Sequence, residues 1–200
     1  MDCSGGHPEW HIKGDVTPLL NGNCTFSTQD SDTNTITIDG QWDMIIAHPP
    51  CTYLTVSANK YYETEIYGEK ARQRYKDRYK AIVFFMQCLL ARCDKVVVEN
   101  PIGIMSTAYQ KPTQIIQPFE FGEPIRKATC LWIRGLDNLK PTQIVTPTLC
   151  KASNGDTYSG SLMMAKDSNG KIIPWNDPRT AIERSKTYWG IARAFAEQWG

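Results

Sequence analysis

A strand–helix–strand pattern in residues 42–98 constrains the fold more than any other feature of this sequence. Residues 42–47, apart from Asp43, and residues 96–98 are short apolar segments, which suits strands buried on both faces of a parallel sheet. Between them, residues 69–93 carry a helical pattern that is basic and polar in its first half and apolar in its second. Because parallel neighbours need a crossover connection, the pattern predicts two adjacent parallel strands in an α/β sheet.

Each of these predicted strands ends in residues that stop sheet pairing. Pro49-Pro50-Cys51 follows the first strand and Glu99-Asn100-Pro101 follows the second, and proline cannot donate to a strand ladder. Residues 11–16 are expected to form a further strand that ends at Gly14-Asp15. Functional residues of such sheets lie beyond the carboxyl ends of the strands. We therefore expect Asp15, Cys51 and Glu99 to lie at one edge of the sheet.

The rest of the chain is expected to add insertions and a closing helix to a single domain, residues 1–200. The expected parts are a β-hairpin insertion over about 23–41 with its turn at 30–34, a mobile loop at 52–68, a strand at 129–133, a small loop-rich region over about 141–175 and a helix at 190–199. The apolar stripe of the last helix must be buried, and we expect it beside the position of the first strand.

Composition excludes several classes of protein. The formal net charge is +1, so a nucleic-acid partner would have to be recognised through local basic patches. No apolar run approaches the ~20 residues that span a bilayer, and no signal peptide is evident, which predicts a cytoplasmic protein without a membrane partner. The seven cysteines show no paired spacing typical of disulfides. Cys3, His7 and His11 lack a nearby fourth ligand, so a packed or solvated loop is favoured over zinc and no metal is expected.

Cys51 and Glu99 are the residue types that the activation of a cytosine ring requires. Carbon 5 of cytosine is a poor nucleophile, and a thiolate that adds to carbon 6 converts the ring into a reactive enamine. A carboxylic acid on ring nitrogen 3 neutralises the charge that develops there. Alone, Pro-Pro-Cys is more often just a strand end, and Glu99 alone would be read as a capping or salt-bridged acid.

The three strand-end motifs together resemble those of DNA cytosine carbon-5 methyltransferases. Pro49-Pro50-Cys51 followed by Ser57 resembles the family's catalytic Pro-Pro-Cys loop, and Glu99-Asn100-Pro101 is similar to its Glu-Asn-Val motif. Gly14-Asp15-Val16 resembles the Gly-Asp-Ile motif, whose Asp contacts the adenine of S-adenosylmethionine. Residues 42–54, 98–101, 121–136 and 184–199 look like small phage- and prophage-encoded members of that family.

The resemblance implies a Rossmann-like sheet, mostly parallel, with helices on both faces, and methylation of DNA cytosine with S-adenosylmethionine as cofactor. Cys51, Glu99 and Asn100 would be catalytic, and the cofactor would be bound by Asp15, Pro49 and Pro50. The residues expected to contact DNA are Ser57, Arg72, Lys76, Arg126 and Lys127. The host would be a bacterial cell.

The sequence also departs from the family. The family's opening strand and glycine-rich turn have no counterpart before Asp15, so the sheet is expected to be N-terminally truncated and to bind S-adenosylmethionine weakly. The open slot would be filled by another segment, by the terminal helix or by a second subunit in a homodimer.

Two other functions compete with this enzyme. One is a degenerate methyltransferase fold that binds DNA or a host-defence protein with little catalysis. The other is an amino-methyltransferase, against which Cys51 at the last position of the motif argues. Residues 70–80 could equally be a solvated helix face, and Tyr53, Tyr61, Tyr62 and Tyr67 are expected to serve loop packing more than base stacking.

Overall fold

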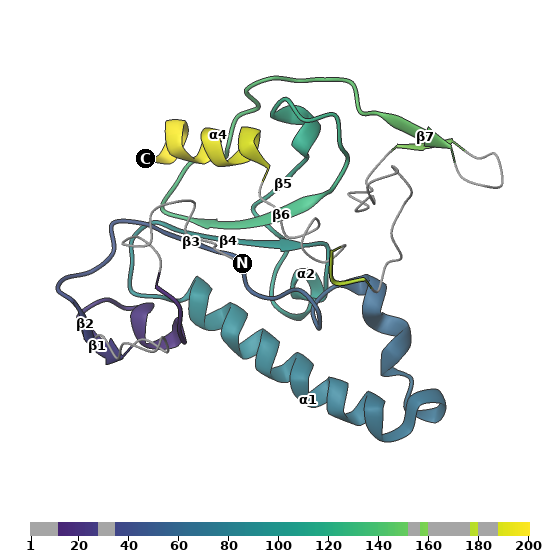
Figure 1. Ribbon diagram of the computed structural model, residues 1–200, viewed down its shortest axis with the longest axis horizontal. Coiled ribbons are helices and arrows are strands. Elements are labelled where there is room, and N and C mark those ends of the chain that lie inside the picture. The colour runs from purple at the N-terminus through teal and green to yellow at the C-terminus, as the bar shows by residue number, and fades with distance from the viewer. Residues whose placement is uncertain (1–11, 28–34, 152–156, 160–176, 180–187) are drawn as a thin grey trace. The chain divides into compact units, whose positions relative to one another are not determined.

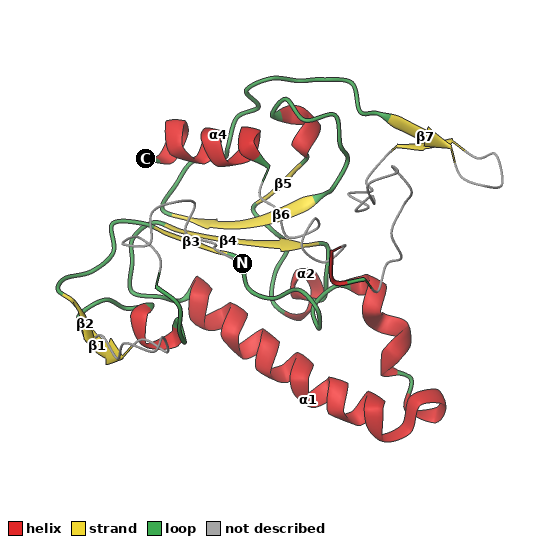
Figure 2. Cartoon of the chain, in the orientation of Figure 1, coloured by secondary structure: helices red, strands yellow, loops and turns green. Residues whose placement is uncertain are grey.

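The structure is a computed structural model that describes residues 12–27, 35–151, 157–159, 177–179 and 188–200. It is a mixed α/β fold (Figures 1 and 2). The chain divides into two compact units, Met1–Lys111 with Trp132–Leu136, and Pro112–Leu131 with Asp137–Gly200. Each unit is described by itself, and a single folding domain stays a prediction.

The first unit contains the expected parallel pair. Strand β3 (Ile45–Ala47) pairs in parallel with β4 (Val96–Pro101), from Ile45 opposite Val96 to Ala47 opposite Val98. Helix α1 (Thr64–Leu89) is the crossover between them and runs alongside β4 in Figure 1. The parallel pair and its crossover are confirmed, because a parallel pair needs such a connection. The expected end of the second strand at Val98 is wrong, since β4 continues through Glu99-Asn100-Pro101.

The expected burial of both strands on both faces is confirmed only for β4. Val96, Val97 and Val98 are fully buried, whereas all three residues of β3 are half-buried. The strand order β3-β4-β6-β5 explains the difference, because β3 lies at the end of that order and β4 lies between two neighbours.

The second unit overturns the expectation of a mostly parallel sheet. Strand β5 (Gln114–Ile116) pairs antiparallel to β6 (Thr129–Arg134), whose last residues belong to the first unit. The sheet is therefore mixed, with one parallel and one antiparallel pair at its two ends. The physical reason is the connection between β5 and β6, which holds only the short 3-10 helix η4 (Pro118–Glu120) and no crossover helix.

The N-terminal expectations have mixed outcomes. Strands β1 (Cys24–Ser27) and β2 (Thr35–Ile38) form the predicted antiparallel hairpin, and its turn at 30–34 lies outside the described residues.

The strand expected at 11–16 is wrong over 12–16, which hold bends and loop before the 3-10 helix η2 (Thr17–Leu19). The reason is local, because the Asp15 carboxylate accepts a hydrogen bond from the Thr17 amide and so favours a turn over extended pairing.

The mobile loop expected at 52–68 is also wrong. Residues Val56–Tyr62 form the 3-10 helix η3, and α1 already begins at Thr64. A kink at Gly68, with φ 51° and ψ −126°, separates the first turn of α1 from its long straight part. Helix periodicity is hard to recognise across such a kink, because the apolar positions on its two sides follow different phases.

Three further elements are short. The short helix α2 (Met105–Ala108) follows β4, and strands β7 (Leu149–Lys151) and β8 (Thr157–Ser159) pair antiparallel within the region expected to be loop-rich. Much of that region, including 160–176, lies outside the described residues.

Helix α4 (Trp189–Trp199) confirms the predicted C-terminal helix and its buried stripe. Ile191, Ala194, Phe195 and Trp199 are buried, and the Trp199 indole donates a 3.0 Å hydrogen bond to the carbonyl of Asp137 in the same unit. Its expected place beside the position of the first strand stays a prediction.

Candidate functional site

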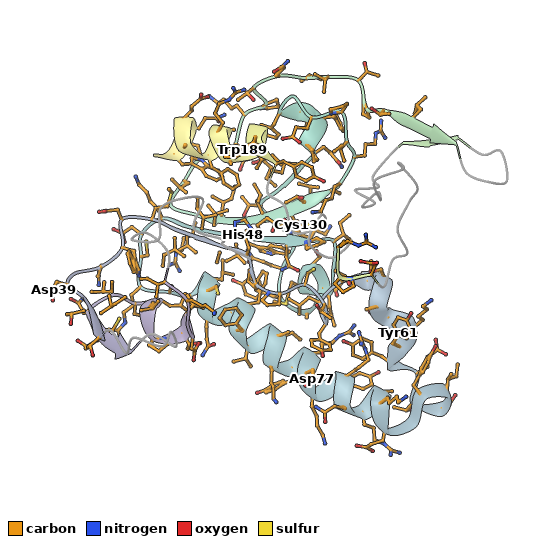
Figure 3. The ribbon with its side chains drawn as sticks, viewed as in Figure 1. Asp39, His48, Tyr61, Asp77, Cys130 and Trp189 are labelled. Atoms are coloured by element: carbon orange, nitrogen blue, oxygen red, sulfur yellow. The ribbon has the colours of Figure 1, made fainter. Side chains whose placement is uncertain are left out.

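The carboxyl ends of β3 and β4 bring two titratable side chains into contact. Since Ala47 lies opposite Val98, the next residues along the two strands, His48 and Glu99, are neighbours. His48 Nδ1 lies 3.0 Å from Glu99 Oε2, and the two side chains are 54% and 22% exposed. In Figure 3, His48 lies beside these strands. The parallel register therefore brings the His48 imidazole within hydrogen-bond distance of Glu99, the carboxylate expected to be catalytic.

Asn100 joins the two strand ends from inside the first unit. Its side chain is buried, and its Nδ2 donates a 2.8 Å hydrogen bond to the carbonyl of Pro49. Its Oδ1 has no hydrogen-bond partner among the described residues. This hydrogen bond holds the Pro-Pro segment beside Glu99. If the segment moved away, the buried Asn100 amide would lose its acceptor, which costs free energy.

The loop after Cys51 is built as a turn and attached to the loop after β4. The Cys51 carbonyl accepts hydrogen bonds from the amides of Leu54 and Thr55, at 2.9 and 3.0 Å, and the Ile104 amide donates a 2.8 Å hydrogen bond to the Leu54 carbonyl. Gly103 allows this approach, since a Cβ there would lie next to the Leu54 carbonyl oxygen. Both strand-end loops therefore form one structure.

The thiol of Cys51 differs from the buried thiol on α1. Cys51 is a free cysteine of intermediate exposure, while Cys88 is buried. Burial raises the pKa of the Cys88 thiol to about 11, because a thiolate loses its hydration in an apolar surrounding. Of these two, only Cys51 is placed to meet a substrate from solvent.

Arg78 and Arg74 on α1 hold the segment that follows Cys51. Arg78 Nε donates a 2.9 Å hydrogen bond to the Tyr53 carbonyl, and its guanidinium lies 3.4 Å from the centre of the Tyr62 ring. The Arg74 guanidinium lies 5.2 Å from the ring centres of both Tyr53 and Tyr62. These contacts give the two tyrosines packing roles, as expected.

Tyr61 and Tyr67 are more exposed than the two packed tyrosines. Tyr61 is 41% exposed and Tyr67 is 36% exposed, with ring centres 5.6 Å apart (Tyr61 is labelled in Figure 3). Tyr61 also lies within 5.4 Å of the Arg74 guanidinium. Their exposed faces are therefore the ones in this segment that a base could meet.

The remaining residues expected to contact DNA in the first unit are exposed. Ser57 donates a hydrogen bond to the hydroxyl of Thr55, Arg72 forms a 3.2 Å ion pair with Glu69 one helical turn before it, and Lys76 lies on the same exposed side of α1. An i,i+3 ion pair is what a solvated helix face contains, so this geometry is compatible with either reading of residues 70–80.

Arg126 and Lys127 belong to the second unit. The Arg126 guanidinium lies 5.6 Å from the centre of the Phe119 ring, and Lys127 Nζ lies 5.3 Å from that of Tyr188. Burial, together with the negative charge of Glu123, raises the pKa of Tyr188 to about 12. Phe119 and Tyr188 belong to the same unit as Arg126 and Lys127.

Asp15 does not take the position that the family resemblance implies. It is exposed, follows no strand in residues 12–16, and accepts a 2.9 Å hydrogen bond from the Thr17 amide that lowers the pKa of its carboxyl. Of the other two residues expected to bind cofactor, Pro50 is exposed, and buried Pro49 already receives the Asn100 hydrogen bond at its carbonyl. Asp15 therefore does not follow a strand, as the resemblance implies for the residue that contacts the adenine of S-adenosylmethionine.

A shallow pocket of about 410 Å³ lies near the amino end of β4. It is lined by Gln41, Ala91, Arg92, Cys93, Asp94 and Arg134. The Arg134 guanidinium is already hydrogen-bonded to the carbonyls of Ala91 and Cys93. Because ligands of α/β sheets bind beyond the carboxyl ends of strands, this pocket is not the expected site.

Comparisons with protein-family models, with curated proteins and with solved structures find no match to this chain. Within the described residues, no helix is long and apolar enough to cross a membrane. Nor do three or more His, Cys, Asp or Glu side chains of that part gather as a metal site would require. Cys3, His7 and His11, for which a packed or solvated loop is expected in place of a zinc site, lie outside the described residues.

His48 is the site residue that the sequence interpretation missed. The available signal was its place directly before Pro49-Pro50-Cys51, combined with the predicted register of the two strands. His48 directly follows β3 and so lies beside the β4 residue that comes after Val98, the partner of Ala47, and that residue is Glu99.

Proposed function

We propose that this chain activates a cytosine of DNA by adding Cys51 to carbon 6 of the ring. This is the first half of the reaction of the DNA cytosine carbon-5 methyltransferases that the sequence resembles. The observation that carries the proposal is the parallel register of β3 and β4. It brings Glu99 of β4 beside the segment that follows β3 and leads to Cys51, and the Asn100 hydrogen bond to Pro49 joins the two. The base would have to be flipped out of the duplex, because carbon 6 is inaccessible within the stack.

The proposed step uses one nucleophile and one acid. The thiolate of Cys51 forms the bond to carbon 6, and the electron pair of the 5,6 double bond moves between carbons 4 and 5. The pair of the carbon 4–nitrogen 3 double bond moves to nitrogen 3, which takes a proton from Glu99. Protonation at nitrogen 3 removes the negative charge that would otherwise oppose the addition. The product is an enamine that is nucleophilic at carbon 5.

In the enzymes that this chain resembles, S-adenosylmethionine supplies a methyl group to carbon 5. Asp15 follows no strand within residues 12–16, unlike the family's adenine-contacting Asp, and this supports weak binding of that cofactor here. We propose that this chain alone binds S-adenosylmethionine weakly and transfers methyl groups slowly or undetectably. A homodimer that completes the site is part of this proposal, as are a cytoplasmic location and a phage or prophage origin.

A second function is favoured by the position of Asp15. A chain that keeps the strand-end loops but lacks a cofactor site would bind DNA or a host-defence protein without catalysis. Exposed Arg72, Lys76 and Tyr61 would then serve binding alone, through phosphate contact and base stacking.

A DNA duplex carrying 2-pyrimidinone at the target position separates the two functions. This base accepts a thiolate at carbon 6 without needing a methyl donor, so a covalent protein–DNA adduct reports the proposed step alone. We expect a heat-stable adduct on a denaturing gel with the full chain, and its loss with Cys51→Ser. Cys24→Ser is the matched control, because Cys24 is a free thiol on the β1 hairpin.

Two results would contradict the proposal. DNA binding without any adduct would favour the binding protein, and an adduct that persists in Cys51→Ser would remove Cys51 as the nucleophile. Labelled methyl transfer from S-adenosylmethionine, measured in parallel, tests the cofactor. Robust incorporation that Cys51→Ala abolishes would show that the chain has a working cofactor site.

A further inference from the structure

We infer that His48 supplies the proton that Glu99 delivers to the base. The inference rests on the proposed function and adds a second residue to its acid. His48 acts through Glu99 and not on the substrate, so it is a positioning residue. Its distinguishing feature is that it both orients the carboxyl group and recharges it with a proton from water.

The geometry provides a short path from solvent to the carboxyl group. His48 Nδ1 and Glu99 Oε2 are 3.0 Å apart, within hydrogen-bond range. The His48 side chain is 54% exposed and that of Glu99 only 22%. The imidazole is thus the more accessible member of the pair, and it can exchange protons with water while it contacts the carboxylate.

The chemistry creates the need for this proton. Nitrogen 3 of neutral cytosine is a hydrogen-bond acceptor, so only a protonated Glu99 can donate to it. A glutamate side chain in water is ionised at neutral pH, whereas histidine exchanges its proton near that pH. The proton that Glu99 gives to nitrogen 3 must therefore be replaced from another group, and His48 lies within hydrogen-bond distance of the carboxyl group.

The proton balance closes with water as the only additional reactant. As Cys51 adds to carbon 6, nitrogen 3 takes the proton of Glu99, and the carboxylate takes the proton on His48 Nδ1. The neutral imidazole then regains, through water, the proton that the Cys51 thiol released when it formed the thiolate. When Cys51 leaves, the same transfers run in reverse. No oxidant, reductant or metal is needed.

A purely structural contact is the alternative. In that case His48 holds the Glu99 side chain in one orientation, and any hydrogen-bond donor at the same place would serve. Asparagine tests this, because its side-chain nitrogen is attached at the γ position, as histidine Nδ1 is. His48→Asn can therefore donate to Glu99 Oε2, but it cannot pass on a proton.

The experiment measures the rate of adduct formation with the 2-pyrimidinone duplex at neutral pH. We expect His48→Asn and His48→Ala both to react about 100-fold more slowly than the wild-type chain, at the lower end of what general acid catalysis contributes. Free imidazole should restore the rate of His48→Ala in a saturable way, because the vacated site is open to solvent. It should not change the rate of the wild-type chain.

Three outcomes would overturn the inference: a wild-type rate in His48→Asn, a wild-type rate in His48→Ala, or slow variants that imidazole does not rescue although their unfolding midpoints match the wild type. The failure of the proposed function would look different. In that case the wild-type chain itself forms no Cys51-dependent adduct, and the role of His48 is rejected with it.

Discussion

Asn100 is the residue on which the proposed site depends most for its geometry. It is 2% exposed, its Nδ2 donates to the Pro49 carbonyl, and its Oδ1 has no partner among the described residues. Burying a polar side chain costs free energy unless its groups are paired. The hydrogen bond from Asn100 to Pro49 therefore offsets part of the cost of burying Asn100. The oxygen left unpaired can accept a hydrogen bond from a bound water or ligand.

Replacing the amide by a carboxyl group of the same shape tests this role. Asn100→Asp removes the donor and places a carboxyl oxygen against the Pro49 carbonyl. We expect a loss of about 1–3 kcal/mol in the free energy of unfolding, measured by urea denaturation, and slower adduct formation at Cys51. The control is Asn138→Asp at an exposed asparagine, which should change neither value. Equal stability of both variants would contradict the role given to Asn100.

At the scale of elements, the segment from Cys51 to α1 is a compact structure. The 3-10 helix η3 is held to α1 by Arg78, which donates to the Tyr53 carbonyl and, at 2.8 Å, to the Asn59 side chain. Gly68 lets the chain turn from the first residues of α1 into its long straight part. The backbone conformation of Gly68 therefore helps to set the direction of the part of α1 that carries Arg78, and so the position from which Arg78 contacts the Tyr53 carbonyl.

Gly68→Ala should separate conformational strain from steric contact. A Cβ at Gly68 meets no atom within 4 Å, but its φ of +51° is rarely adopted by residues with a side chain. We expect the thermal unfolding midpoint to fall, with a loss of about 1–3 kcal/mol in stability. Gly14→Ala is the matched control, since it also meets nothing within 4 Å and its φ is not in that range. A Gly68→Ala chain as stable as the control would contradict the kink.

On the scale of the whole molecule, each of the two compact units contains packed aromatic side chains. In the first, Phe85 of α1 packs edge-on against Trp132 with ring centres 4.9 Å apart. In the second, Phe195 and Trp199 of α4 stack at 4.7 Å, and Gly190 lies against the Phe121 carbonyl. Strand β6 is the element whose residues belong to both units.

Gly190→Ala should therefore act on the second unit. A Cβ at this position would overlap the Phe121 carbonyl oxygen, so α4 must shift away. We expect a loss of about 1–3 kcal/mol, with faster amide hydrogen exchange in α4 and β5 and unchanged exchange in β4. Trp189→Ala, at a side chain that is 84% exposed, is the control and should leave exchange unchanged. Equal acceleration in β4 would instead indicate that both units unfold as one domain.

What the sequence determined by itself is local. Short apolar segments, breakers after them and a helical pattern between them predicted β3, β4 and most of α1, because burial and hydrogen bonding select these elements from a few residues at a time. The β1–β2 hairpin and helix α4 followed from the same periodicities. The position of Cys51 after β3 followed from them as well, whereas Glu99, expected directly after the second strand, lies within β4.

Tertiary structure decided the rest. The antiparallel pairing of β5 and β6 depends on contacts across the sheet, and so does the half-buried state of β3. The helix η3 replaced an expected loop, and it is held by hydrogen bonds from Arg78, far along the chain, that no periodicity reports. The turn at Asp15 is local, but a side-chain hydrogen bond sets it, which periodicity does not report either. The His48–Glu99 contact joins residues 51 positions apart, so it required the register of two strands that only folding brings together.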